Sequence, residues 1–195
     1  MFDAITKFEN QLSHYTGAKW AVMTDCCTHA IELCFIYNKV TKTSFTPYTY
    51  LSVLMLMHKL DIHYNLLDEP CQEWIGEYSF DNTNIWDSAR RLERGMYRPG
   101  SMQCLSFGHS KPLEIGRGGA ILLDDPTAYK ALKEMSYDGR DLSISPWQDQ
   151  KEFRVGYHYK PTIEEAKIGS RLLTEIKEQS QFIKYPDLRN VRIVT

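Results

Sequence analysis

Apolar residues recur along this chain with two periods, one typical of helices and one typical of buried strands. The helical period predicts a helix from Phe2 to Tyr15, with Gly17 at its C-terminal cap. A short apolar, β-prone run from Trp20 to Thr24 predicts a buried strand, and a second helix is expected from about Ala30. The chain therefore opens with a helix, a strand, a tight polar turn and another helix.

The alternation of strands and helices continues along the rest of the chain. Further strands are predicted at residues 43–46, 61–67, 84–86, 102–107, 119–123 and 191–194, and further helices at 49–59, 126–136 and 162–179. The last helix begins with a capping box, in which Thr162 is followed three positions later by Glu165. This order predicts an α/β fold with three α/β/α layers, in which helices cover both faces of a mostly parallel sheet.

Composition and charge narrow the range of partners. The chain has 195 residues, 43% of them hydrophobic and 25% charged, which suits a globular domain with a substantial core. A formal net charge of −2 argues against a nucleic-acid-binding surface, which needs a basic excess. The longest apolar stretch, Leu51 to Met57, is too short to cross a membrane, and the N-terminus lacks a signal-peptide pattern. We therefore expect a cytoplasmic protein that binds neither nucleic acid nor membrane.

The five cysteines indicate neither a disulfide framework nor a metal centre. None forms a C-x-x-C pair, and no cluster of histidines and cysteines has the spacing of zinc ligands. Their odd number and the expected cellular setting favour reduced thiols, and we expect no metal site.

Polar residues follow three of the predicted strands. They are Cys27-Thr28, Asp87, and the stretch from Ser106 to Lys111, which leads into the glycine-rich turn Gly116 to Ala120. In a sheet of this kind ligands bind beyond the carboxyl ends of the strands, so we expect the three groups to form one site. A lysine between a strand and a glycine-rich turn can project its amine into a cleft. Spacing alone also fits a solvated surface lysine, and the aspartate also fits a helix cap.

These residues belong to a longer ordered set. In chain order the set is Phe8-Glu9, Tyr15 to Ala18, Thr28 with Ala30-Ile31, Pro47 with Thr49-Tyr50, Asp87 to Ala89, Ser106-Phe107 with Lys111, Gly116 to Ala120, Gly139-Arg140 and Gly156 to Lys160. The order, and the five-residue step from Ser106 to Lys111, resemble the DegT/DnrJ/EryC1/StrS family of pyridoxal 5'-phosphate-dependent sugar aminotransferases. The resemblance implies the aspartate aminotransferase type of fold, with a minimised cofactor-binding large domain at residues 1–180 and a C-terminal tail at 181–195.

The resemblance implies a role for each residue that matches the family pattern. Lys111 would bind pyridoxal 5'-phosphate covalently and move the proton between the substrate carbon and the cofactor. Asp87 would keep the pyridine nitrogen protonated, which makes the ring an electron sink. Backbone amides at Cys27 and Thr28 would hold the phosphate at a helix N-terminus, and the Ser106 hydroxyl would add a further hydrogen bond.

Three further positions receive roles by the same resemblance. Tyr50 would stack on the cofactor ring, although an aromatic helix residue in the core also fits. His158 stands where the family usually has an asparagine that reaches the phosphate of the neighbouring subunit in a homodimer. Arg90 stands where the family usually has a glutamine beside the phenolic oxygen of the cofactor. A permanent cation at that position would alter the cofactor's electronics or point away from it.

Two features of length depart from the family pattern. The stretch between Asp61 and Asp87 is much shorter, as if a strand and a helix were missing, and the chain ends soon after the capped helix, without the C-terminal small domain. The first functional hypothesis is a pyridoxal 5'-phosphate-dependent aminotransferase that moves an amino group from an amino acid to a keto-sugar nucleotide. The alternative is a catalytically impaired protein of the same fold that binds a ligand or a partner chain without transaminating. An unrelated α/β binding domain is the third.

Overall fold

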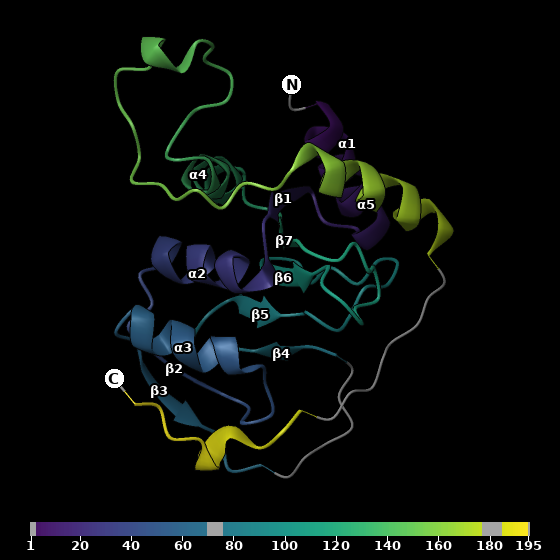
Figure 1. Ribbon diagram of the computed structural model, residues 1–195. Helices are drawn as coiled ribbons and strands as arrows, with labels where there is room; N and C mark the ends of the chain where they lie inside the picture. The colour runs from purple at the N-terminus through teal and green to yellow at the C-terminus, as the bar shows by residue number, and fades with distance from the viewer. Residues whose placement is uncertain (1–2, 70–75, 177–184, 195) are drawn as a thin grey trace.

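The computed structural model describes residues 3–69, 76–176 and 185–194. In chain order its elements are α1 (Asp3–Thr16), β1 (Trp20–Thr24), α2 (Cys27–Tyr37), β2 (Lys42–Phe45), α3 (Leu51–Lys59), β3 (His63–Leu66), β4 (Tyr78–Ser79), β5 (Ile85–Asp87), β6 (Met102–Ser106), β7 (Gly119–Leu123), α4 (Pro126–Ser136), the 3-10 turn η1 (Trp147–Asp149), α5 (Ile163–Glu175) and the 3-10 turn η2 (Leu188–Asn190). The predicted helices and strands up to α5 are present (Figure 1), and β4 is an additional strand. The strand predicted at residues 191–194 is absent, because that segment follows η2 as an extended chain without a pairing partner among the described strands.

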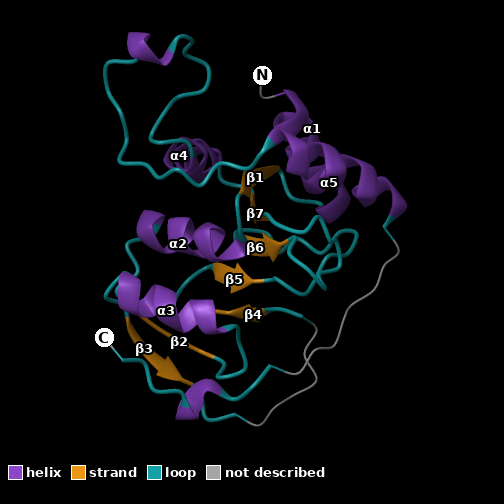
Figure 2. Ribbon diagram, in the orientation of Figure 1, coloured by secondary structure: helices purple, strands orange, loops and turns teal. Residues whose placement is uncertain are grey.

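The strands form two sheets. The larger has the order β1-β7-β6-β5-β4, and the smaller pairs β2 with β3 in parallel (Figure 2). In the larger sheet β5 and β6 are parallel, whereas the other three neighbouring pairs are antiparallel. The sheet is therefore mixed, which differs from the mostly parallel sheet that the alternation predicted. The reason is that a loop rather than a crossover helix joins β6 to β7, so β7 returns antiparallel to its neighbour.

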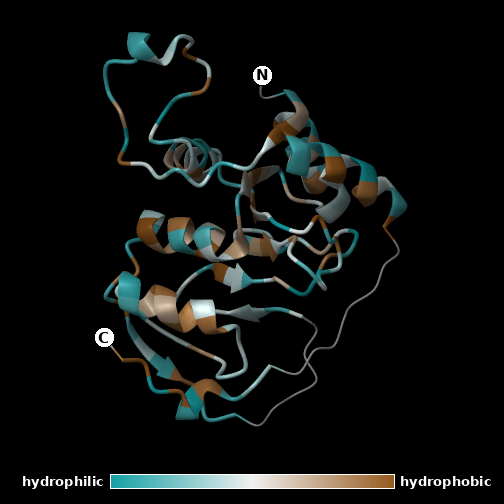
Figure 3. Cartoon of the chain, in the orientation of Figure 1, coloured by the Kyte–Doolittle hydropathy of each residue, from teal (hydrophilic) through white to brown (hydrophobic). Residues whose placement is uncertain are grey.

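Helices cover both faces of the larger sheet, which confirms the α/β class and the three layers. Side chains alternate between the faces, so Val22 of β1 joins a core cluster with α2, α3 and α4, whereas Met23 joins a second cluster with α1 and α5. Hydrophobic and hydrophilic stretches alternate along α1 and α5 (Figure 3), as expected of helices buried on one side. These two helices pack closely, because a Cβ atom at Gly169 would lie 2.5 Å from the Phe8 ring.

A buried carboxylate fastens the edge of the larger sheet. The Glu77 side chain is fully buried and forms ion pairs with Arg91 and Arg98. The Ser88 hydroxyl donates to it at 2.8 Å and the Gln103 amide at 3.1 Å. A buried charge of this kind is stable only because every lone pair has a partner. The network therefore holds the segment before β4 against the loop that follows β5.

The C-terminal segment returns to the smaller sheet. Leu188 is 4% exposed in the first core cluster, and its N–H donates to the Pro47 carbonyl oxygen at 3.1 Å. Arg189 forms an ion pair with Asp68 at 2.9 Å. The division into a domain at residues 1–180 and a tail at 181–195 stays a prediction, since residues 177–184 lie outside the described part of the chain.

Two further predictions concern membranes and thiols. Within the described residues, the structure contains no helix of sufficient length and hydrophobicity to span a membrane. Cys26, Cys27, Cys34 and Cys104 are free thiols, as predicted, and Cys71 lies outside the described residues.

Candidate active site

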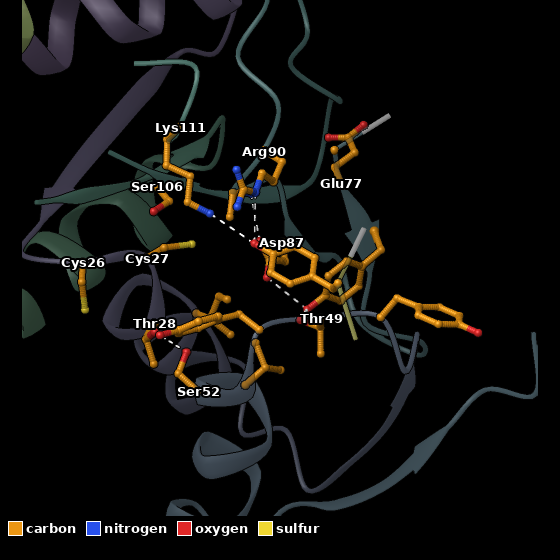
Figure 4. Close-up of a pocket in the computed structure, with 18 of the residues that line it drawn as sticks. Cys26, Cys27, Thr28, Thr49, Ser52, Glu77, Asp87, Arg90, Ser106 and Lys111 are labelled. Atoms are coloured by element: carbon orange, nitrogen blue, oxygen red, sulfur yellow. Dashed lines mark hydrogen bonds between the residues drawn. The ribbon is translucent and has the colours of Figure 1, made fainter. Parts of the chain in front are cut away.

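A cavity of about 430 Å³ opens where β5 and β6 end and where α2 and α3 begin. Its volume is in the range of sites for small molecules and cofactors. Seven of the eight predicted site residues line it, namely Cys27, Thr28, Tyr50, Asp87, Arg90, Ser106 and Lys111 (Figure 4). The three polar groups that follow predicted strands therefore do meet in one place, although their chemical roles stay predictions.

Strand register explains why the groups meet. Thr24 of β1 and Ser106 of β6 both lie opposite Gly119, at the start of β7. The turn into α2 passes directly over Gly119, where a Cβ atom would lie 2.5 Å from the Cys26 carbonyl carbon and 2.5 Å from the Cys27 nitrogen. Only a residue without a side chain allows this approach, which brings the N-terminus of α2 to the end of β6.

One corner of the cavity is suited to an anion. The first N–H groups of α2 have no acceptor within the helix, and the helix dipole adds positive potential there. Thr28 and Ser52 share a hydrogen bond of 2.8 Å at this corner (Figure 4), and Ser106 lines the cavity nearby. The Cys27 thiol lies 3.6 Å from the Cys104 carbonyl oxygen, and burial raises its pKa well above the ordinary range. The Cys27 side chain therefore stays neutral at this corner.

Asp87 is held at the inner end of the cavity. It is 7% exposed, accepts from the Ala89 N–H at 2.9 Å and from the Tyr78 hydroxyl at 3.0 Å. Burial raises the pKa of Asp87, and the Ala89 N–H, the Lys111 charge and the Tyr78 hydroxyl oppose that rise only in part. The Ala89 bond is the local turn that a capping role requires, but no helix follows β5. Asp87 therefore presents a partnered carboxylate to the cavity.

Lys111 and Arg90 lie together, and both side chains point toward Asp87 (Figure 4). The Lys111 amine donates to the Tyr185 hydroxyl at 3.3 Å. Arg90 donates to the same hydroxyl through Nε at 3.1 Å and to the Ser110 carbonyl oxygen through Nη1 at 2.6 Å. Of the two alternatives predicted for Arg90, a side chain that points away from the site is therefore wrong: Arg90 lies at the cavity wall.

Two predicted residues lie apart from this inner group. Tyr50 is 63% exposed at the start of α3, so it lines the rim of the cavity and is not a core residue. His158 does not line the cavity; its side chain is 70% exposed and pairs with Asp138 at 3.1 Å. The neighbouring Tyr159 does reach the turn before α2, because its carbonyl oxygen accepts from the Asp25 N–H at 2.9 Å.

A charged cluster supports the turn before α2. Asp25 binds His29 at 2.7 Å and Arg117 at 2.9 Å. The hydrogen bond to Asp25 raises the pKa of His29 to about 9, and the imidazole stacks on Tyr159 with ring centroids 3.7 Å apart. Ligand atoms of Asp25, Cys26 and His29 lie within 4.8 Å of one another, although their spacing in the sequence is not that of a zinc site. The Arg117 guanidinium already neutralises the carboxylate, so the cluster acts as an ion-pair network at the helix start.

Sequence reasoning missed two tyrosines that touch the predicted residues. Tyr78 bridges Asp87 and the Thr49 hydroxyl, the latter at 2.6 Å, from a stretch that looked only acidic and polar. The alternation of Tyr78, Ser79 and Phe80 has the period of a strand and was the available signal. Tyr185 carried no such signal, because its position depends on contacts that the next few residues make far away in the sequence, such as that of Leu188 with Pro47.

Comparisons with known proteins concern the family and the fold of the chain. The profile of the DegT/DnrJ/EryC1/StrS aminotransferase family matches residues 93–182, which confirms the resemblance indicated by the sequence. No curated protein matches the chain.

Solved structures show the fold. The chain is similar to 3-amino-5-hydroxybenzoic acid synthase, with 18% identity, a TM-score of 0.72, and coverage of 89% of this chain and 56% of that one. It is also similar to NtdA from Bacillus subtilis with bound cofactor PMP, with 17% identity, a TM-score of 0.73, and coverage of 87% of this chain and 47% of that one. A third similar structure is DesI in the presence of its TDP-sugar product, with 17% identity, a TM-score of 0.70, and coverage of 88% of this chain and 52% of that one. The fold is that of the pyridoxal 5'-phosphate-dependent aminotransferases, and the chain spans about half the length of these structures.

Proposed function

From the resemblance to the DegT/DnrJ/EryC1/StrS aminotransferases, we propose that this chain is the cofactor-binding part of a pyridoxal 5'-phosphate-dependent aminotransferase. The amino group would move from an amino acid, glutamate or glutamine, to a keto-sugar nucleotide. The observation that carries the proposal is that Lys111, Asp87 and the N-terminus of α2 line one cavity. A cytoplasmic setting stays a prediction alongside it.

The residues present fit this cofactor. It carries an aldehyde, a basic ring nitrogen and a phosphate, and the cavity offers a half-buried amine, a buried carboxylate and a helix N-terminus at separate places on its wall. The neutral Cys27 thiol adds no negative charge next to the phosphate corner. Thr28 and Ser106 supply hydroxyl groups there, and Tyr50 at the rim is free to cover the ring.

Each residue then contributes a simple task. When bound, pyridoxal 5'-phosphate supplies an electron sink that makes a proton on the substrate carbon acidic. Lys111 would hold the cofactor and would carry that proton on its Nζ atom. Asp87, kept in place by Tyr78 and Ala89, would supply a negative charge to the ring nitrogen. The α2 N–H groups and the Thr28 and Ser106 hydroxyls would bind the phosphate.

The direct test is Lys111→Ala. We expect the wild-type protein to develop a visible absorbance band with added pyridoxal 5'-phosphate and to retain the cofactor after borohydride reduction, with the adduct mapped to Lys111. The variant should lose both signals completely. Lys130→Ala is a matched control on the exposed side of α4 and should keep them. An adduct on another lysine, or none in the wild type, would contradict the proposal.

We extend the proposal to a homodimer with composite active sites. The loop between α4 and α5 projects from the rest of the chain (Figure 1). Its apolar residues Trp147, Phe153 and Val155 are 48%, 46% and 80% exposed. Exposed apolar groups on a projection suit a protein interface. His158 follows this loop and makes no contact with its own cavity, so it would reach the phosphate corner of the partner chain.

Light scattering measures the oligomeric state, and cofactor titration measures the role of His158. We expect a dimer, and His158→Ala should weaken cofactor affinity by about threefold without separating the chains, as expected for one lost surface hydrogen bond. His63→Ala, on the exposed face of β3, is the control and should change neither. A monomer that binds the cofactor normally would exclude the composite site.

One observation favours a second function, namely binding of the cofactor without transamination. The Arg90 guanidinium lies beside Lys111 and shares its hydroxyl partner. Arg90 stands where the family usually has a glutamine, so a permanent charge replaces a neutral amide beside the amine that would hold the cofactor. A half-reaction with glutamate separates the two functions: an aminotransferase converts the cofactor spectrum to that of its amine form, whereas a binding protein leaves the spectrum unchanged.

A further inference from the structure

Tyr185 contacts the amine at the centre of the proposed function and lies beyond residue 182, where the family match ends. Its hydroxyl accepts from Lys111 at 3.3 Å and from Arg90 at 3.1 Å, and the Arg90 guanidinium lies 5.4 Å from the centre of its ring. Among the described residues, Tyr185 is the hydrogen-bond partner that the structure gives to the Lys111 amine. Tyr185 therefore touches the predicted reactive atom from outside the residues that the family profile matches.

The chain around Tyr185 is anchored beside the cavity. Three residues later Leu188 is buried in the core, and its N–H bonds to the Pro47 carbonyl oxygen. Arg189 donates to the hydroxyl of Tyr48, which itself lines the cavity, at 3.3 Å. Burial of one leucine side chain stabilises such a segment more than an exposed ion pair does. Tyr185 thus reaches Lys111 from a docked segment.

A hydroxyl has the right chemistry for a lysine that changes its protonation state. It accepts a hydrogen bond from an ammonium group and donates one to the lone pair of a neutral amine. Arg90 cannot do the second, because a guanidinium has no acceptor. The Asp87 carboxylate can only accept hydrogen bonds. It already accepts from the Tyr78 hydroxyl and the Ala89 N–H.

We propose that Tyr185 is a positioning residue, whose hydroxyl holds the Lys111 amine at the cavity wall beside Arg90. The inference rests on the proposed function for its consequence, since the held amine is the one that would bind the cofactor. The contact itself is independent of any cofactor. Loss of the hydroxyl frees the amine for small reagents but removes the orientation that cofactor attachment requires, so the two effects have opposite signs.

The test compares Tyr185→Phe with wild-type protein in two measurements. In the first, without cofactor, sulfo-N-hydroxysuccinimide acetate acylates the lysines for a short time, and peptide mass spectrometry gives Lys111 relative to exposed Lys7. We expect Tyr185→Phe to raise the Lys111 rate by about fivefold, the equivalent of one lost hydrogen bond. In the second, the same variant should slow borohydride-trapped attachment of pyridoxal 5'-phosphate by a similar factor.

Two further variants make the result specific. Leu188→Ala loosens the docked segment and should change both rates in the same directions as Tyr185→Phe. Tyr64→Phe removes a hydroxyl that lies 3.4 Å from His58 Nε2, away from the cavity, and should change neither. Circular dichroism confirms that each variant is folded.

The outcomes separate the contact from the proposed function. Unchanged acylation of Lys111 in Tyr185→Phe would overturn the inference. An increase in both the acylation rate and the rate of cofactor attachment would also overturn it, because Tyr185 would then only shield Lys111 from reagents. If the wild type attaches no cofactor while Tyr185→Phe still raises acylation, the contact is supported and the proposed function fails. Faster acylation together with slower cofactor attachment supports the contact and the proposed function.

Discussion

The two walls of the cavity differ in how far their residues could be predicted from the sequence. One wall consists of Asp87 at the end of β5, Lys111 in the loop after β6, and the start of α2, which follows β1. The other is formed by Tyr78 of the two-residue strand β4 and by Tyr185 before η2, both from stretches in which no helix or strand was predicted. The first wall supplies the groups with which a cofactor would react, whereas the second supplies hydroxyls that hold those groups. Local pattern therefore indicates the chemistry, and distant contacts fix its geometry.

The largest effect should come from the first wall. Asp87→Ala removes the carboxylate that would pair with the ring nitrogen under the proposed function, and we expect pyridoxal 5'-phosphate affinity to fall by about thirtyfold, or about 2 kcal/mol, as for a hydrogen bond to a charged group. Titration of the visible band measures this. Asp81→Ala, on the surface turn before β5, is the control. Unchanged affinity in Asp87→Ala would return this residue to the role of a turn former.

The pH dependence sharpens the same point. Burial raises the pKa of Asp87, so its carboxylate is protonated at a higher pH than that of an exposed aspartate. Cofactor affinity should accordingly decline as the pH falls toward that raised pKa, because protonation removes the charge that would pair with the ring nitrogen. Asp87→Asn should bind weakly at every pH and lose this acidic decline. A decline that persists in Asp87→Asn would point to another group.

A smaller effect is expected from the second wall. Tyr78→Phe leaves the inner oxygen of Asp87 without its donor, which should cost about 1 kcal/mol, or about fivefold in cofactor affinity. It should also move the acidic decline toward higher pH, because the hydroxyl lowers the pKa of Asp87. Tyr37→Phe, at the end of α2, is the control. Equal losses for Tyr78→Phe and Asp87→Ala would erase the distinction between the two walls.

The smallest effect concerns the support of the α2 turn. The pKa of His29 is raised to about 9 from 6.5, so its bond to Asp25 stabilises the folded state fully below pH 6.5. This stability is lost as the pH rises through 9. Since His29 is partly exposed, we expect His29→Gln to lower the free energy of unfolding by about 0.5–1 kcal/mol at pH 6 and by less at pH 10. Urea unfolding at the two pH values measures this, and a difference that grows with pH would exclude the ion pair.

The sequence predicted most elements because their signals are local. Helical spacing marked α1 and α4, and the capping box at Thr162 is present in the structure with both of its hydrogen bonds. Strand directions were harder to predict, because the mixed sheet follows from a loop between β6 and β7 that no apolar period describes. In the site, polar residues after strands were found, whereas Tyr185 was not, since its position depends on the burial of Leu188 far from Lys111.

The shape of the cavity depends on the absence of a side chain at Gly119. This glycine donates nothing to a ligand, yet its missing side chain lets the α2 turn lie against β7. Even the single methyl group of alanine would push the anion-binding corner away from the end of β6, while leaving every polar group of the cavity unchanged. In a library of substitutions, position 119 should therefore be as intolerant as a reactive residue, and random change could silence the site without altering its chemistry.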